Sequence, residues 1–436
     1  MKLSIKKGSE NYAAQVIELP PKIPVPGLDN LVQVTFQGNN CLVQKSAPDN
    51  QKYLFIPAGA VLDAEFIANN NLYRHSQKNI DTAKSGFIED SGRVKALKFK
   101  GVISTGLIVP LKSIGFLADP QLLNTGDSFT DIDNKPICYK YTLRKGGFKS
   151  GDKLPKFDIE KVIESKFAPE HTDTDQLLKI KYASRFSLKS NICITHKLHG
   201  TSIRVFHTRT KRKLRLMDKI ARVFGIEVAD HEFGYIVGSR RVIKSKNFGA
   251  LNNAKYFKKD LWTQVAQQYL KGKLNQGEAI YAEVIGMDYA GAPIQQEYTY
   301  GYTSPNLFIY RITQINDGGV EVDLSWEQVK QRAAQIGVKT VPEFYFGPID
   351  LLMEKYNVTV KENKEGPDII TAFETLFHQH LLDKPSVLNR QVIEEGFVVR
   401  QETYPKVTAY KVKSRKFMLY ESIQQDKEIA DVEDAN

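Results

Sequence analysis

The stretch that decides the fold reads Thr195-His196-Lys197-Leu198-His199-Gly200-Thr201-Ser202. Residues 191–195 are mostly apolar, which predicts a strand that ends at Lys197. Taken alone, a lysine in the turn after a strand is usually a solvated side chain. A lysine becomes a covalent nucleophile only where desolvation or neighbouring cations lower the pKa of its amine. The role of Lys197 therefore depends on what the rest of the chain places beside it.

Two fragments near the end of the chain carry charges of the kind that such a site needs. Glu395 stands before a glycine and a predicted strand, 397–400, that ends in an arginine. Lys411 and Lys413 lie two residues apart in another predicted strand, 409–413, so they share one face of it. Each fragment alone is typical of a solvated strand face, so their order along the chain carries more information than either one.

The composition limits the class of protein. The 436 residues, 42% hydrophobic and 25% charged, suit two or three globular domains. A formal net charge of +11 favours a polyanionic partner such as nucleic acid, although many basic proteins simply carry a solvated surface. Cys41, Cys138 and Cys193 are odd in number and far apart, which argues against a disulfide framework or a zinc site. No window approaches the roughly 20 apolar residues of a membrane span. We therefore expect a monomer, cytoplasmic or otherwise intracellular, with no membrane partner.

The first part of the chain is expected to be β-rich. Residues 31–36 alternate apolar and polar side chains, and residues 53–57 form an apolar run that ends at a proline. Residues 93–101 also alternate, which predicts a strand whose apolar set faces a core and whose basic set faces water or a ligand. Short strands between Gly, Asn and Asp predict a small barrel of OB type, with an open sandwich as the alternative.

A basic stretch rich in glycine and proline, residues 140–165, is the candidate linker, with a short helix expected around 158–166. This divides the chain into an N-terminal OB-like domain, 1–165, a second domain, 166–425, and an acidic tail, 426–436. Residues 424–436 are acidic and polar, so we expect them to be frayed.

The second domain shows a mixed α and β pattern, which makes the expected fold class α+β. Its apolar runs and helical periodicities predict strands at 279–285, 306–312, 397–400 and 409–413, and helices at 211–224, 326–336 and 369–382. The helix at 326–336 is expected to stop at Gly337, because glycine favours the left-handed conformation that ends many helices.

Taken in order, these fragments resemble the signature of the covalent nucleotidyltransferases, the superfamily of RNA ligases, DNA ligases and mRNA capping enzymes. The resemblance implies a nucleotidyltransferase domain of antiparallel sheets and helices. Its motifs match a K-x-x-G element at 197–200, Ser239-Arg240, a strand with Glu283, a strand with Tyr310, an E-G-x-V-x-R element at 395–400, and Lys411 with Lys413. All six follow the family's order.

Two details point to one branch of that superfamily. His199 stands where DNA ligases and capping enzymes usually have aspartate, whereas one group of RNA ligases has histidine. Only 23 residues follow Lys413, which leaves no room for the C-terminal OB domain of those other enzymes. The layout, together with residues 92–104, resembles the RNA ligases with an N-terminal OB module, which join 3′-OH and 5′-phosphate RNA ends.

The resemblance implies a three-step reaction. Lys197 attacks the α-phosphate of ATP and forms lysyl-AMP, the AMP moves to an RNA 5′-phosphate, and an RNA 3′-OH then displaces it. The resemblance also implies a role for each motif residue. Lys411 and Lys413 would contact the α-phosphate, Arg240 would contact the ribose or a phosphate, and Glu283 would contact the ribose. Tyr310 would stack on the base, with Phe308 as the fallback, Glu395 would face a divalent metal (Mg²⁺ or Mn²⁺), and Gly200 would let the backbone approach the nucleotide closely. His199 either contacts a phosphate or packs the loop.

Several points stay open at this stage. Glutamate, which helps to read adenine, commonly precedes the nucleophile in this group, and here His196 takes its place. Arg93, Lys95, Lys98 and Lys100 could line a groove for RNA phosphates or pyrophosphate, or could simply solubilise a barrel face; residues 209–213 could also touch RNA. The alternatives are a DNA ligase, a capping-type guanylyltransferase, or a non-catalytic RNA-binding protein.

Overall fold

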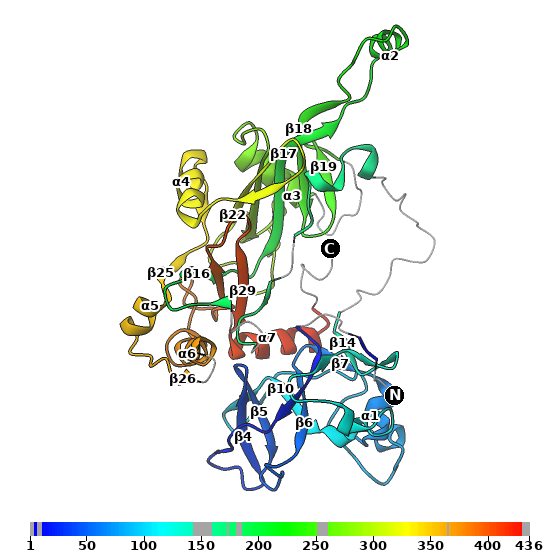
Figure 1. Ribbon diagram of the computed structural model, residues 1–436, viewed down its shortest axis with the longest axis vertical. Coiled ribbons are helices and arrows are strands. Elements are labelled where there is room, and N and C mark those ends of the chain that lie inside the picture. The colour runs from blue at the N-terminus through cyan, green and yellow to red at the C-terminus, as the bar shows by residue number, and fades with distance from the viewer. Residues whose placement is uncertain are drawn as a thin grey trace.

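The computed structural model describes residues 4–6, 11–142, 159–171, 174–179, 185–250, 260–363 and 366–429 (Figure 1). Most of the predicted linker lies outside these residues, as does the end of the predicted tail. The short helix expected around 158–166 is replaced, among the described residues, by two 3₁₀ turns at Ile159–Lys161 and Ser165–Phe167.

The N-terminal part is β-rich, as expected, and it lies at the bottom of Figure 1. Its main sheets have the strand orders β10-β6-β2-β11 and β3-β4-β5. Its strands are β1 (Ile5–Lys6), β2 (Ala14–Glu18), β3 (Ile23–Pro24), β4 (Leu31–Phe36), β5 (Asn39–Gln44), β6 (Lys52–Pro57), β7 (Ala60–Leu62), β8 (Leu97–Phe99), β9 (Val102–Ser104), β10 (Gly106–Pro110), β11 (Ser128–Phe129), β12 (Asp131–Ile132), β13 (Lys135–Pro136) and β14 (Cys138–Lys140), with helix α1 (Ala64–Asn69).

Strand β6 connects two apolar cores of this part. Leu54 and Ile56 are fully buried on one face, whereas Tyr53 and Phe55 pack into a second cluster on the other face. A run that is apolar at every position therefore marks a strand covered on both sides. The predicted strands at 31–36 and 53–57 are confirmed by β4 and β6.

The prediction for residues 93–101 was wrong. Only Leu97–Phe99 form a strand there, and Leu97 and Phe99 are about half exposed, at 56% and 49%. Arg93 is instead buried, and its guanidinium donates to Asp426 at 2.8 Å. Lys95 pairs with Asp426 at 2.8 Å and also with a nearby glutamate. These two cations are therefore structural partners of the far end of the chain.

The described residues of the C-terminal part form two main sheets. The larger has the order β20-β19-β18-β17-β21-β22-β23, with β24 paired to β22, and the smaller has the order β15-β29-β28-β16-β25. Their strands are β15 (Asp175–Gln176), β16 (Asn191–Lys197), β17 (Thr201–Lys211), β18 (His231–Ser239), β19 (Ile243–Lys246), β20 (Gly249–Ala250), β21 (Glu278–Ile285), β22 (Asn306–Ile315), β23 (Glu321–Asp323), β24 (Lys339–Thr340), β25 (Glu343–Pro348), β28 (Gly396–Gln401) and β29 (Thr408–Lys413). In addition, β26 (Glu362–Asn363) pairs antiparallel with β27 (Gly366–Pro367).

Helices cover these sheets and explain why their strands are apolar. Helices α3 (Leu261–Leu270) and α4 (Trp326–Ile336) pack into a core with the larger sheet. Helices α5 (Ile349–Lys355) and α6 (Ile369–Leu376) pack into a second core with the smaller sheet. The predicted end of α4 is confirmed, because Gly337 has the left-handed φ of 70°. The α+β fold class is thus confirmed.

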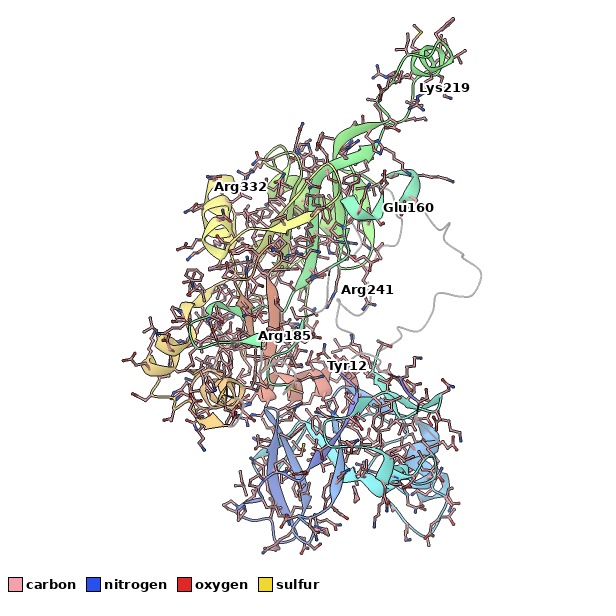
Figure 2. The ribbon with its side chains drawn as sticks, in the orientation of Figure 1. Tyr12, Glu160, Arg185, Lys219, Arg241 and Arg332 are labelled. Atoms are coloured by element: carbon pink, nitrogen blue, oxygen red, sulfur yellow. The ribbon has the colours of Figure 1, made fainter. Side chains whose placement is uncertain are left out.

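The predicted helix at 211–224 is shorter than expected. Helix α2 (Leu216–Val223) begins five residues later, because β17 continues through Lys211 as a long hairpin with β18. This hairpin carries α2 on an arm that projects from the larger sheet, and Lys219 lies at its tip (Figures 1 and 2). None of the helices in the described part of the chain is long and apolar enough to cross a membrane.

Residues 424–436 were expected to be frayed, but residues 424–426 form the last turn of helix α7 (Arg415–Asp426). It follows β29 directly and lies between the C-terminal part and the N-terminal part (Figure 1). Gln424 is buried, and Ser422 accepts a hydrogen bond from the backbone of Ala96 at 2.9 Å. Together with the Asp426 contacts to Arg93, these bonds attach the N-terminal part to the helix.

Candidate functional site

Lys197 ends β16, at the edge where the two sheets of the C-terminal part face each other. Its amine lies 2.6 Å from Oε1 of Glu395, which is 2% exposed. Strand pairing sets this contact, because Lys197 is opposite Gly396 in the β16–β28 register. The structure therefore brings together two residues that are almost 200 positions apart in sequence.

The turn after Lys197 is held by hydrogen bonds to the carboxylate of Glu283. The amide of Gly200 donates to Oε1 of Glu283 at 3.0 Å, and the hydroxyl of Ser202 donates to Oε2 at 3.3 Å. A Cβ at Gly200 would lie 2.3 Å from the carbonyl oxygen of Val284, so a larger residue has no room. Glu283, expected to contact a ribose, thus also holds the turn that follows the lysine.

Lys411 and Lys413 project from β29 toward the same site. Lys413 is opposite Gly396 in the β28–β29 register, and its amine lies 4.0 Å from Glu395 and 2.7 Å from Glu421 of α7. Glycine is required at 396, where φ is 152° and a Cβ would lie 2.1 Å from a backbone oxygen of β29. This close approach lets Glu395 reach both Lys197 and Lys413.

The two lysines have opposite electrostatic surroundings. Burial lowers the pKa of Lys411 to about 7, and the nearby cations Lys413, Lys197 and Arg240 add to this effect. Burial also opposes the charge of Lys413, but Glu421 and Glu395 outweigh it and raise the pKa of that amine well above its ordinary value. The site thus holds one lysine that readily loses its proton beside another that keeps it.

Two cavities meet at Lys197. The first, of about 200 Å³, lies between the N-terminal part and the site and is lined by Gln37, Lys179 and both β29 lysines. The second, of about 400 Å³, lies between the two sheets and reaches Tyr310. Lys197, Arg240 and Glu283 line both cavities. A ligand that extends from one cavity to the other would therefore pass the amine of Lys197.

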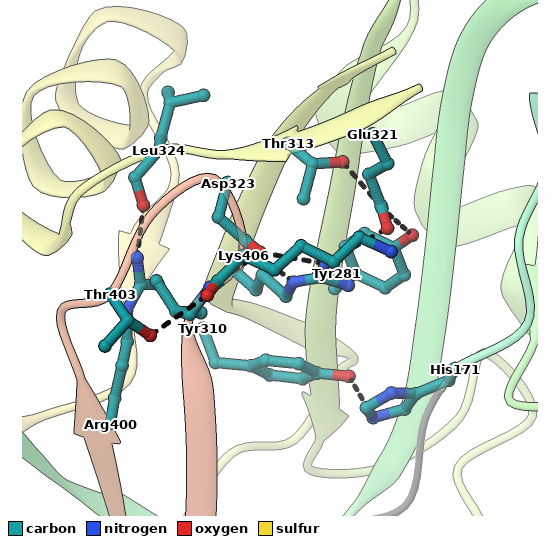
Figure 3. A network of polar contacts seen from close by, with 12 residues as sticks. His171, Tyr281, Tyr310, Thr313, Glu321, Asp323, Leu324, Arg400, Thr403 and Lys406 are labelled. Carbon is teal, nitrogen blue, oxygen red and sulfur yellow. Dashed lines mark hydrogen bonds and ion pairs between the residues drawn. The ribbon is translucent and has the colours of Figure 1, made fainter. Parts of the chain in front are cut away.

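Tyr310 lines the larger cavity, but the fallback Phe308 does not lie on the same face. Tyr281 and Ala282 pair with Arg311 and Ile309, so Tyr310 is the extra residue of a bulge in β22. Phe308, beyond this bulge, is 2% exposed and packs into the core. The hydroxyl of Tyr310 lies 3.1 Å from Nε2 of His171, a residue that the sequence patterns did not single out (Figure 3). Phe308 is therefore not placed to contact a base.

His196 lies on the opposite face of β16 from Lys197. Its Nδ1 is 2.9 Å from Oε2 of Glu394, and its ring packs 4.8 Å from that of Phe397, in the core beside the smaller sheet. Thr195, two residues before the lysine and on the same face of the strand, lines the larger cavity, and His196 also borders it. Alternation along the strand could have indicated the place of Thr195, since residues 195 and 197 share a face.

His199 is largely buried beside the site. Its ring packs edge-on against Tyr298 and Phe417, each with ring centroids 5.0 Å away. Its Nδ1 is 4.0 Å from Oε2 of Glu395, beyond hydrogen-bond distance. Of the two expectations for His199, the geometry favours packing of the loop.

One carboxylate oxygen of Glu395 is available to interact with a metal ion. Its Oε2 is buried and accepts no hydrogen bond from the described residues. A buried carboxylate oxygen of this kind can be satisfied by a hydrated divalent cation. The described residues form no cluster of three or more His, Cys, Asp or Glu side chains that would bind a metal by themselves. A cation at Glu395 would therefore depend on water and on substrate oxygens for its remaining ligands.

The cysteines and the basic arm stay apart from this site. Cys41, Cys138 and Cys193 are free and buried in separate cores. Residues 209–213 lie on the β17–β18 arm (Figure 1).

Comparison with known proteins agrees with this architecture. Three solved structures of variants of the Naegleria gruberi RNA ligase match nearly the whole chain. The variant with AMP and Mn is 15% identical, with a TM-score of 0.57, and covers 93% of this chain and 97% of its own. Two variants with ATP and Mn are also 15% identical, with TM-scores of 0.57 and 0.56; they cover 93% and 95% of this chain and 98% and 99% of their own. At this identity the likeness shows the fold.

No curated protein sequence matches the chain. A family model described as RNA ligase matches residues 190–415, which include Lys197, Glu283, Glu395 and both β29 lysines. Because this match covers more than half of the 436 residues, the chain belongs to the RNA ligase family.

Proposed function

We propose that the protein is an ATP-dependent RNA ligase that acts through a covalent lysyl-AMP at Lys197. One observation carries the proposal: Lys197 lies between two cavities, in contact with Glu395 and close to the β29 lysines. The solved relatives with ATP or AMP and Mn support this choice of nucleotide.

In the first step the amine of Lys197 attacks the α-phosphorus of ATP. A P–N bond forms, the bond from phosphorus to the bridging oxygen breaks, and pyrophosphate leaves. The amine must lose its proton before or during the attack, and a neighbouring cation such as Lys413 would favour that loss. Lys413, which keeps its charge, would neutralise the phosphate oxygens, and such positioning and neutralisation supply most of the catalysis in phosphoryl transfer.

The other residues have supporting roles. Arg240 lines both cavities and would hold the ribose or a phosphate, for which its planar fork suits. Tyr310 would stack on the base, and Glu283 would contact the ribose while it holds the turn at Gly200. A divalent metal, Mg²⁺ or Mn²⁺, at the unpaired oxygen of Glu395 would add charge neutralisation at the phosphate.

The later steps would move AMP to an RNA 5′-phosphate and join it to an RNA 3′-OH, as the resemblance to the branch with an N-terminal OB module implies. The protein would therefore bind RNA ends. Such ends occur in a nicked duplex, in a broken tRNA loop and in free single strands. A basic chain with a net charge of +11 suits such a partner. We also propose that it acts as a monomer inside the cell.

The first experiment is self-labelling with α-labelled ATP and Mn²⁺ or Mg²⁺. Wild-type protein should become labelled, and Lys197→Arg should not, although arginine can keep the ion pair with Glu395. Lys219→Ala, on the distant arm, is the matched lysine control and should label normally. A labelled Lys197→Arg protein would overturn the assignment, and labelling by GTP instead of ATP would indicate a guanylyltransferase.

The second experiment is joining of a nicked duplex with RNA or DNA on each side of the nick. A 3′-OH RNA strand should be required, and a DNA 3′-OH strand should be joined far more slowly. Equal joining of all-DNA nicks would contradict the RNA ligase proposal, and RNA binding without any labelling would indicate a non-catalytic protein.

A further inference from the structure

Residues 163–169, which precede the strands of the C-terminal sheets, pack against the larger sheet. Ile163 and Phe167 are buried, at 1% and 3%, in a core that they share with Tyr281. The guanidinium of Arg204, itself 2% exposed on β17, donates to the carbonyl oxygen of Pro169 at 2.5 Å. The backbone up to residue 169 is therefore held against the sheet. Because His171 follows only two residues later, its position is restricted as well.

His171 meets Tyr310 at the wall of the larger cavity. Its Nε2 lies 3.1 Å from the tyrosine hydroxyl, the ring centroids are 5.7 Å apart, and the ring planes differ by 27°. The ring centroid of Tyr281 lies 6.1 Å from that of His171. Figure 3 shows His171 at the hydroxyl end of Tyr310, below the contacts of Glu321 with Tyr281.

This contact controls a degree of freedom that packing alone controls weakly. The torsion that sets the plane of a tyrosine ring has a broad energy profile. Because the hydroxyl oxygen lies on the axis of this torsion, a hydrogen bond to His171 restrains the ring plane through the O–H bond, which conjugation keeps in that plane. Stacking on a base depends on that plane, because offset and tilt decide the contact. A phenylalanine at this position could be held only by its neighbours, whereas the hydroxyl of Tyr310 has a fixed partner.

We propose that His171 is a positioning residue for nucleotide binding, which acts through the hydroxyl of Tyr310 to hold that ring in the plane that accepts a purine base. This inference rests on the proposed function, since it assumes that Tyr310 stacks on the base of ATP. His171 does not take part in the phosphoryl transfer itself. It sets the affinity for the nucleotide before the reaction.

The test measures self-labelling rates against ATP concentration for His171→Ala, Tyr310→Phe and the double variant. Each single variant should raise KM for ATP by about 3- to 10-fold, the range expected for loss of one hydrogen bond, with little change in the rate at saturating ATP. The double variant should lose no more than either single variant, because both remove the same bond. His171→Gln, which can still offer a nitrogen to the hydroxyl, should recover part of the affinity.

A matched pair elsewhere gives the control. His207 stacks on Tyr235 with ring centroids 4.6 Å apart, and neither lines the two cavities. His207→Ala should leave KM unchanged. Additive losses in the His171/Tyr310 double variant, or an unchanged KM in the single variants, would refute the positioning role while wild-type labelling still stands. Absence of labelling in the wild type would instead refute the proposed function.

Discussion

Replacing Lys411 by methionine should make the folded protein more stable while it removes activity. The folded state lowers the pKa of Lys411 from 10.5 to about 7, because burial and neighbouring cations disfavour its charge. That drop corresponds to an upper limit of about 4 to 5 kcal/mol, at about 1.4 kcal/mol for each pKa unit. Because water and side-chain movement screen part of the repulsion, we expect a gain of at least about 2 kcal/mol at pH 6.

The gain should depend on pH in a defined direction. Below about pH 7 the amine is charged in both states, so the wild-type protein bears the full cost of the buried charge. Between about pH 7 and 10.5 the folded amine is neutral while the unfolded amine still binds a proton. Unfolding then takes up a proton, so wild-type stability from this group rises with pH and the advantage of Lys411→Met shrinks.

Urea unfolding followed by tryptophan fluorescence measures this directly, because Trp262 and Trp326 are both buried in the core of the larger sheet. Wild type and Lys411→Met should be compared at pH 6 and pH 9.5. The variant should also fail to self-label with ATP, since the proposal gives Lys411 an α-phosphate contact. The electrostatic reasoning would be refuted if Lys411→Met were less stable than wild type at pH 6. It would also be refuted if the variant gained the same free energy of unfolding at both pH values.

Further predictions concern the neighbouring lysine and the glycine turn. Lys413→Met should destabilise the protein by about 1 to 3 kcal/mol in the same unfolding assay, because it leaves Glu421 without its charged partner; a stabilised variant would contradict this. Gly200→Ala should abolish self-labelling, because the added carbon would lie 2.3 Å from a backbone oxygen of β21, whereas Gly249→Ala, with its nearest contact at 3.4 Å, should label normally. Normal labelling by Gly200→Ala would show that the turn can move.

Sequence patterns predicted the elements whose partners are local or whose apolar runs are long. Strand β6 and helix α4 were predicted with nearly their observed bounds, because continuous burial and a glycine stop leave strong local signals. The strand prediction for residues 93–101 failed because the hydrogen-bond partner of Arg93 lies 333 positions away in the sequence. The same distant partner explains why residues 424–426 looked frayed in the sequence and are helical in the fold.

The site shows the same division. The motif residues could be named from their order, and the structure brings Lys197, Glu395 and both β29 lysines together. Sequence could not indicate His171, which belongs to no motif and matters only because the fold brings it to the Tyr310 hydroxyl. It also misjudged Phe308, because the bulge at Tyr310 in β22 itself cannot be read from a regular two-residue alternation.

Helix α7 makes the order of synthesis matter. The lysine pair of β29 directly precedes this helix, and its last turn holds Arg93 of the N-terminal part. At about 5 to 20 residues per second, a ribosome needs roughly 15 to 70 seconds to travel from one partner to the other. During that interval the N-terminal part can fold, but Arg93 has no carboxylate from α7. The contacts that α7 makes with the N-terminal part can therefore form only after this helix has left the ribosome, which delays any site that depends on them.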